Sequence, residues 1–238
     1  MKSAPMQLAL NLRLPAHATF ETFVAGPNAG VVRAVHALAG RTPERQIYLW
    51  GAGGVGKSHL LQALCRAQGE GSRPSVYLPL GEIRSLSPGI LEGVEELSVV
   101  CIDDVHLAAG DPEWELALFG LTNRCRDTGC ILVLAARGAP TQLGIALPDL
   151  ASRLAWGPVY RLRPLEDGDR IRALQLHGAQ RGLDIPDEVG RYLLTRSSRE
   201  LRALLGVLDT LDEVSLATRR RITVPLVRSV LAGGMPST

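Results

Sequence analysis

The stretch that decides the fold is Gln46-Ile47-Tyr48-Leu49-Trp50-Gly51-Ala52-Gly53-Gly54-Val55-Gly56-Lys57-Ser58. An apolar run typical of a β-strand leads into a glycine-rich turn, and an apolar helical pattern follows directly. Strand, glycine-rich loop and helix in this order predict a P-loop. The glycines let successive backbone N–H groups point into one concavity around a phosphate, and the helix behind adds partial positive charge. A glycine-rich turn before an ordinary helix is the weaker interpretation, because the whole pattern Gly-x-x-x-x-Gly-Lys-Ser is in place.

The P-loop predicts a role for each of its residues. We expect Lys57 to reach the β- and γ-phosphates of a bound nucleotide and Ser58 to ligate Mg²⁺. The expected nucleotide-binding residues of this segment are Gly51, Gly53, Gly54, Val55, Gly56, Lys57, Ser58 and His59.

A second apolar run, residues 97–102, leads straight into Asp103-Asp104. A continuous apolar run suits a strand that is buried on both faces of a parallel sheet. Carboxylates at the carboxyl end of such a strand lie where open α/β sheets bind their ligands. We therefore expect Asp103 to hold Mg²⁺ through water and Asp104 to polarise an attacking water.

Composition narrows the class of protein. The chain has 238 residues, 46% of them hydrophobic and only 4% aromatic, so a sizeable aliphatic core is available. A net charge of +2 argues against a strong, non-specific nucleic-acid binder. The four cysteines contain no C-x-x-C pair and the five histidines show no metal-ligand spacing, so we expect reduced thiols in the cytoplasm. No apolar run approaches ~18 residues, so we expect neither secretion nor a membrane span.

The N-terminal arm alternates apolar and polar residues over Gln7-Leu8-Ala9-Leu10-Asn11-Leu12. An extended peptide could place Leu8, Leu10 and Leu12 on one side and dock into a partner's apolar groove, with Gln7 as a polar anchor. An edge strand of the same protein or a disordered tail also explains the pattern. Alternation over six residues is weak evidence for a docking peptide, so the pattern alone favours the edge strand or the tail.

The segment after the arm carries two of the chain's three phenylalanines, Phe20 and Phe23. The two rings could wall the adenine face of a nucleotide, or they could plug the bottom of the domain; the pattern does not separate these interpretations. Asn28 is expected to cap a helix over 29–39.

The rest of the chain predicts an α/β domain followed by a helical one. Strand patterns over 75–80, 97–102, 130–136 and 159–162 alternate with helical patterns, which implies a doubly wound parallel sheet flanked by helices. From Pro164 onward the periodicity is helical only. We therefore expect an extended arm at 1–17, a nucleotide-binding α/β domain at 18–164 and a small all-α lid domain at 165–238.

These features together resemble the AAA+ ATPases, and the match narrows to the DnaA-related family. Residues 19–28 resemble the N-terminal segment of the DnaA-type initiators, and residues 147–157 resemble the box that holds the arginine finger in that clade. Residues 110–115, Asn123-Arg124 and the short lid resemble the Hda group, the regulatory inactivators of DnaA. Ala136-Arg137 stands where the family has a polar, often acidic, sensor.

The resemblance implies a regulatory function. It assigns Arg153 as an arginine finger acting in trans, Arg199 as the lid arginine on the nucleotide, and Gln7-Leu8-x-Leu10-x-Leu12 as a clamp-binding peptide. The implied activity is that an ADP-bound (or ATP-bound) protein with Mg²⁺, docked on the DNA polymerase III β sliding clamp, stimulates ATP hydrolysis by DnaA and so prevents reinitiation. The same resemblance implies little intrinsic ATPase activity and a homodimer. It also implies a nucleoid-associated location in the cytoplasm, DNA contact mainly through the clamp, and no membrane partner. The sequence ends soon after the lid, so we do not expect the initiators' C-terminal DNA-binding domain in it. The alternative is a self-sufficient AAA+ ATPase such as a helicase loader.

Overall fold

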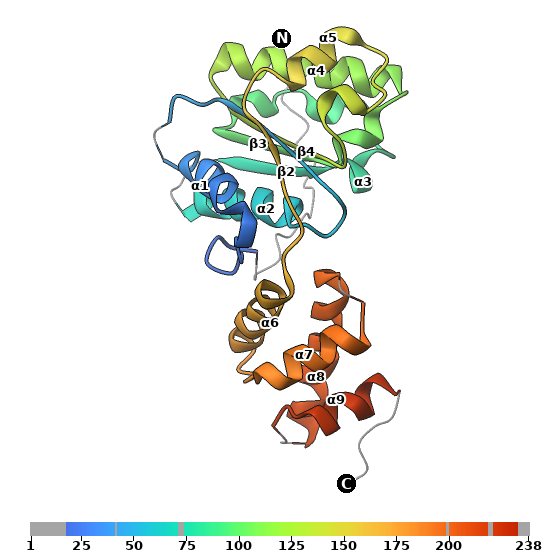
Figure 1. Cartoon of the computed structure of the whole chain (residues 1–238). Helices are drawn as coiled ribbons and strands as arrows, with labels where there is room; N and C mark the ends of the chain where they lie inside the picture. The colour runs from blue at the N-terminus through green and yellow to red at the C-terminus, as the bar shows by residue number, and fades with distance from the viewer. Residues whose placement is uncertain (1–17, 41, 71–73, 199, 219–220, 233–238) are drawn as a thin grey trace. The chain divides into compact units, whose positions relative to one another are not determined.

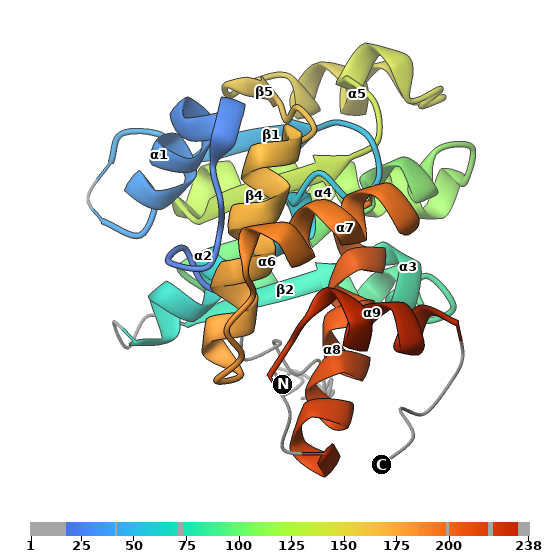
Figure 2. The same ribbon diagram turned by 60° about the horizontal axis from the view of Figure 1, so that its bottom comes forward.

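The protein is built on a parallel β-sheet, as its alternating strand and helix patterns predicted. The computed structural model describes residues 18–40, 42–70, 74–198, 200–218 and 221–232. Five strands pair in the order β2-β3-β4-β1-β5, and every pairing is parallel (Figures 1 and 2). The strands are β1 (Gln46–Trp50), β2 (Ser75–Pro79), β3 (Val99–Asp103), β4 (Ile131–Ala136) and β5 (Val159–Arg161).

Helices cover both faces of this sheet. In Figure 1, α1 and α2 lie on one face, and α4 and α5 lie on the other. The helices of this part are α1 (Ala29–Ala37), α2 (Lys57–Glu70), α3 (Leu80–Ile83), α4 (Pro112–Thr128) and α5 (Pro148–Leu154). Short 3-10 turns are η1 (Gly26–Asn28), η2 (Pro88–Leu91), η3 (Val94–Glu96), η4 (Val105–Ala108) and η5 (Pro140–Gln142). All residues of β3 and β4 are buried, which explains why both strands are uniformly apolar until Asp103.

The described residues divide into two compact units: 18–20 with 28–163, and 21–27 with 164–232. The second unit is helical and contains α6 (Asp167–Gln180), α7 (Asp187–Arg196), α8 (Leu201–Thr218) and α9 (Val224–Leu231). Its core is formed by leucine, isoleucine and valine side chains, Leu193 and Leu208 among them. Gly190 lets α7 approach α6 closely, because a Cβ there would lie 2.8 Å from Ile171 Cγ2.

The prediction that Asn28 caps α1 is wrong. Its side chain makes no capping hydrogen bond, and the helix ends at Ala37 rather than at residue 39. The buried carboxamide instead pairs with the backbone of Arg163: Nδ2 donates to the carbonyl at 2.9 Å and Oδ1 accepts from the N–H at 2.8 Å. Residues 28 and 163 stand at two of the three points where the chain passes between the units, so this pair joins two of the three crossings.

None of the helices in the described part of the chain combines the length and the apolar character needed to span a bilayer.

Candidate nucleotide-binding site

The P-loop connects the end of β1 to the start of α2. Gly51 and Gly56 adopt φ angles of 153° and 98°, in the region that favours glycine. Gly51 also has no room for a side chain, because a Cβ there would lie 2.6 Å from the carbonyl oxygen of Leu162. Gly53 and Gly54 are exposed, whereas Val55 is buried beneath the loop. The loop therefore rests on the sheet and leaves its glycine-rich side open.

Lys57 is held by the loop that precedes it. Its ammonium donates hydrogen bonds of 2.8 Å to the carbonyls of Gly51 and Ala52, and the residue is only 7% exposed. Burial lowers the pKa of Lys57, while the carboxylates of Asp103 and Asp104 act in the opposite direction. The cation thus lies at the mouth of the loop with two acidic side chains close enough to affect it.

Asp103 is the last residue of β3 and is buried. Its Oδ2 accepts a hydrogen bond of 2.9 Å from the Tyr77 hydroxyl, and its Oδ1 accepts one of 2.8 Å from the N–H of Asp104. Burial raises the pKa of Tyr77, and the charge of Asp103 adds to that shift. The Tyr77 hydroxyl also interacts with the side chain of Ser58. Tyr77 therefore links the two residues expected to serve Mg²⁺, and their hydroxyl and carboxylate oxygens are donors that this ion prefers.

Asp104 adopts the left-handed conformation, with φ at 55°. Among the described residues it is the one non-glycine with a positive φ, which marks a strained position next to the site. His106 Nδ1 lies 3.9 Å from Asp104 Oδ1. Burial lowers the pKa of His106, and the positive charges of Arg137 and Lys57 lower it further against the opposing effect of Asp104.

Sequence reasoning missed Tyr77 and His106, and it saw Arg137 only as a departure from the family. No spacing pattern marks the first two: Tyr77 lies within β2 and His106 in the turn after Asp104. Arg137 follows β4 directly and its charge lowers the pKa of Lys57, so a second cation acts on the same site. The pairing of Trp50 with Ala136 explains this, because it brings the P-loop and Arg137 to the same end of the sheet.

The remaining nucleotide-site candidates are only partly brought together. The ring of His59 is 2.8 Å from the carbonyl of Thr19, and Phe20 packs edge-on against His36 with centroids 4.7 Å apart. Phe23 falls in the second unit, so an adenine wall shared by both phenyl rings stays a prediction. The clamp-peptide residues and the lid arginine lie outside the described residues: Gln7, Leu8, Leu10, Leu12 and Arg199.

Arg153 lies in the last turn of α5 and packs against aromatic rings. Its guanidinium carbon is 3.6 Å from the centroid of Trp156 and 5.7 Å from that of Phe119. Its backbone carbonyl accepts a hydrogen bond of 2.7 Å from Gln46 Nε2, at the start of β1. Within the part of the chain that the structure describes, no carboxylate forms an ion pair with Arg153.

Comparison with known proteins finds two matching family models. Residues 167–231 match the family model of the Hda lid domain, and residues 14–76 match that of the bacterial DnaA ATPase domain. Together these two matches support the Hda group of DnaA-related AAA+ proteins. The Hda lid match coincides with the helical second unit, from the first residue of α6 to the last of α9.

Solved structures agree with this fold. Domain III of DnaA from Thermotoga maritima superposes with a TM-score of 0.78 at 23% identity, over 94% of this chain and all of that one. AMPPCP-bound DnaA from Aquifex aeolicus gives 0.70 at 21% identity, over 83% of this chain and 66% of that one. A Thermotoga maritima RuvB variant gives 0.64 at 15% identity, over 86% and 67%. The predicted AAA+ sheet and helical lid are thereby confirmed.

Proposed function

We propose that this protein regulates the initiation of DNA replication by stimulating ATP hydrolysis on DnaA, with Arg153 as an arginine finger supplied in trans. The observation that carries this proposal is that the P-loop and Arg153 are attached to opposite ends of β1. The P-loop leaves the last residue of the strand, whereas the backbone of Arg153 is bonded to its first residue, Gln46. The four steps from Gln46 to Trp50 rise about 13 Å at roughly 3.3 Å each. That separation supports action on another molecule's nucleotide.

The guanidinium suits that task chemically. It stays positively charged at any physiological pH and presents five N–H donors in a planar fork. Charge spreads over the γ-phosphate oxygens in the transition state, and an arginine finger that offsets this charge is worth roughly 10³–10⁵ in rate in other systems. Arg153 packs on the Trp156 ring and, among the described residues, forms no ion pair, so they leave its charge unneutralised.

The protein's own nucleotide site would hold ADP or ATP with Mg²⁺. Loop N–H groups and Lys57 would bind the phosphates, Ser58 would ligate the ion, and Asp103 would hold it through water. The ion would supply positive charge that offsets the charge of the phosphates. AMPPCP bound in two solved DnaA structures supports a nucleotide here. For Asp104 we propose that it orients a water, should the chain hydrolyse its own nucleotide.

The N-terminal arm would dock this regulator on the β sliding clamp. A peptide of residues 5–14 is expected to bind the clamp, and Gln7→Ala is expected to weaken that binding. The same contact accounts for a nucleoid-associated location in the cytoplasm and for DNA contact through the clamp. A peptide that shows no affinity for the clamp removes this part of the proposal.

The deciding experiment is a DnaA–ATP hydrolysis assay with the full chain, with and without clamp loaded on DNA. Arg153→Ala should abolish stimulation while nucleotide binding by the chain itself persists. Arg33→Ala, which changes an exposed arginine on α1, is the matched control and should stimulate normally. Full stimulation by Arg153→Ala would refute the finger assignment.

A self-sufficient ATPase is the second candidate, because the carboxylates of Asp103 and Asp104 lie close enough to the Lys57 ammonium to affect its pKa. Phosphate release by the chain alone separates the two functions. Fast release that Asp104→Asn suppresses would favour the ATPase, whereas negligible release with strong stimulation of DnaA favours the regulator.

A further inference from the structure

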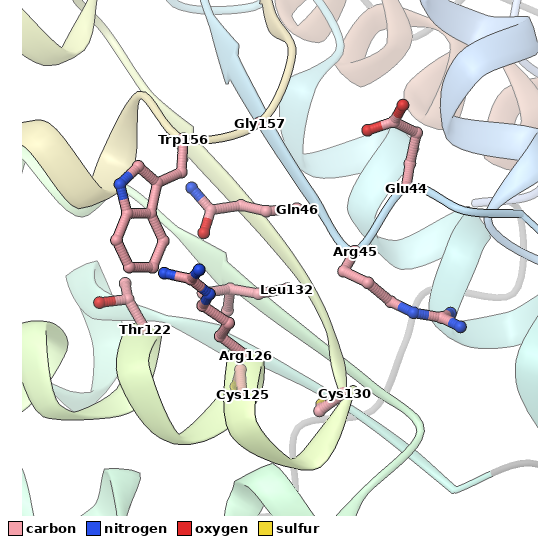
Figure 3. A pocket seen from close by; sticks show the side chains of 10 residues that line it. All are labelled: Glu44, Arg45, Gln46, Thr122, Cys125, Arg126, Cys130, Leu132, Trp156 and Gly157. Carbon is pink, nitrogen blue, oxygen red and sulfur yellow. The ribbon is translucent and has the colours of Figure 1, made fainter.

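A hollow of about 410 Å³ lies at the end of the sheet where β1 and β4 begin. Gln46 and Leu132 line it from the strands, Arg126 lines it from the last turn of α4, and Trp156 lines it from the turn after α5 (Figure 3). The P-loop follows the opposite end of β1, so this hollow is separate from the nucleotide site. None of the functions proposed above uses it.

The charged side chains around the hollow are mostly positive. Arg126 and Arg45 are both exposed, and Glu44 is the single acidic residue of the lining. In the described part of the chain, neither arginine forms an ion pair. The guanidinium of Arg126 lies 4.3 Å from the centroid of Trp156, and Glu44 and Arg45 lie on the other side of the hollow (Figure 3).

The aromatic wall is held firmly in place. Gln46 Nε2 bonds the carbonyl of Arg153, which fixes the end of α5 against β1. The next residue, Gly157, lies so close to the carbonyl of Gln46 that no side chain would fit at that position. The Trp156 ring contacts both Arg126 and Arg153. The hollow therefore shares one wall with the proposed arginine finger.

We propose that this hollow receives an acidic side chain of the DnaA molecule on which Arg153 acts; this inference rests on the function proposed above. Guanidinium forks match carboxylates in bidentate geometry, and an aromatic wall excludes water from the pair. A DnaA surface that brings its nucleotide to Arg153 must also cover the neighbouring Trp156 ring. The occupant is thus part of the docked protein. Its carboxylate is recognised by Arg126, and Arg45, whose side chain points away from Arg126 in Figure 3, adds positive charge at the rim of the hollow.

The test is direct binding of the full chain to immobilised DnaA–ATP, measured by biolayer interferometry. Arg126→Glu is expected to weaken binding about tenfold, because a close charge pair at the interface is lost. Arg45→Glu is an independent second variant in the same direction. Glu44→Gln removes the acid of the lining and should tighten binding by roughly two- to threefold. Arg33→Glu makes the same charge change as Arg126→Glu on α1 and should stay within about twofold of the parent.

Two results overturn the proposal. Equal weakening by Arg126→Glu and Arg33→Glu would show that net charge alone matters. Saturable binding of free glutamate at low millimolar concentration would assign the hollow to a small molecule instead. ATP hydrolysis measured on the same samples separates the proposed function from the proposed role of the hollow. Binding without stimulation of hydrolysis refutes the proposed function. The order of the variants in binding affinity then still decides the role of the hollow. Absence of binding by the parent chain refutes both.

Discussion

Glu115 offers the sharpest test of how the finger-bearing helix is positioned. This carboxylate lies in the first turn of α4 and is only 1% exposed. Its Oε1 accepts hydrogen bonds from the N–H groups of Gly110 at 2.8 Å and Ala146 at 3.0 Å, and its Oε2 accepts one from Leu147 at 2.7 Å. One buried acid thus attaches the segment just before α5 to α4. We predict that Glu115→Gln substantially destabilises the first unit.

The magnitude follows from the three donors. A glutamine amide keeps one oxygen and replaces the other with NH₂, so at least one backbone N–H faces another donor. An unsatisfied buried donor costs about 1–3 kcal/mol, and the bonds that remain lose their charge assistance. We therefore expect Glu115→Gln to lower the free energy of unfolding by about 2–4 kcal/mol.

The effect depends on pH in a defined direction. Burial alone would raise the pKa of Glu115, but the three backbone N–H groups outweigh it and the pKa is lowered. A lowered pKa means that the folded state prefers the charged form. The stabilisation is therefore fully present above the unfolded pKa of about 4.3, and it is lost as the pH falls through the folded value. The difference between the parent and Glu115→Gln should shrink correspondingly below about pH 4.

Urea unfolding followed by tryptophan fluorescence is the appropriate assay. All three tryptophans, Trp50, Trp114 and Trp156, belong to the first unit, so their emission reports on it alone. Glu113→Gln is the matched control, because it removes the same charge from an exposed position in the same helical turn. The control should change the unfolding free energy by less than about 1 kcal/mol. Equal effects of the two substitutions would refute the reasoning.

Three further substitutions test the contacts that organise the first unit, each by the same unfolding assay. Gly157→Ala places a Cβ against the carbonyl of Gln46 and should cost more than about 2 kcal/mol; a tolerated alanine would mean that the turn is looser than described. Asn28→Ala removes both hydrogen bonds to the Arg163 backbone and should cost about 1–3 kcal/mol, and Asn28→Asp, which sets a buried carboxylate oxygen against the Arg163 carbonyl, should cost at least as much. Tyr77→Phe deletes the hydroxyl bonded to the buried carboxylate at the end of β3, with an expected loss of about 1.5–3 kcal/mol; an unchanged midpoint would show that water replaces it.

Local patterns accounted for the framework of the molecule. The P-loop, the apolar strands and the helical periodicity after Pro164 each depend on residues close together in the sequence, so the parallel sheet and the lid could be predicted. The placement of Asn28 could not, because its partner Arg163 is 135 positions away. A capping residue and a long-range bridge look identical in sequence when both stand before a helix.

The candidate site likewise contains residues that local sequence patterns predict and residues that they do not. Lys57 and Asp103 were expected because motif and strand end identify them, whereas Tyr77 reaches Asp103 only through the pairing of β2 with β3. The pairing of Arg153 with Trp156 is local, three residues apart, yet the sequence does not reveal it. It requires α5 to end at Leu154, so that the turn that follows returns the indole ring to the guanidinium.

The central strand β1 constrains how this protein could be regulated. β1 is paired on both sides, with β4 and β5, and its three middle residues are buried. The P-loop and the Arg153 turn are attached to its two ends, so they form parts of one rigid element. A nucleotide that changes only the P-loop cannot then move Arg153 relative to the sheet. If exchanging ADP for ATP alters the proposed stimulation, the response must arise outside this strand, for example in the docking of the partner.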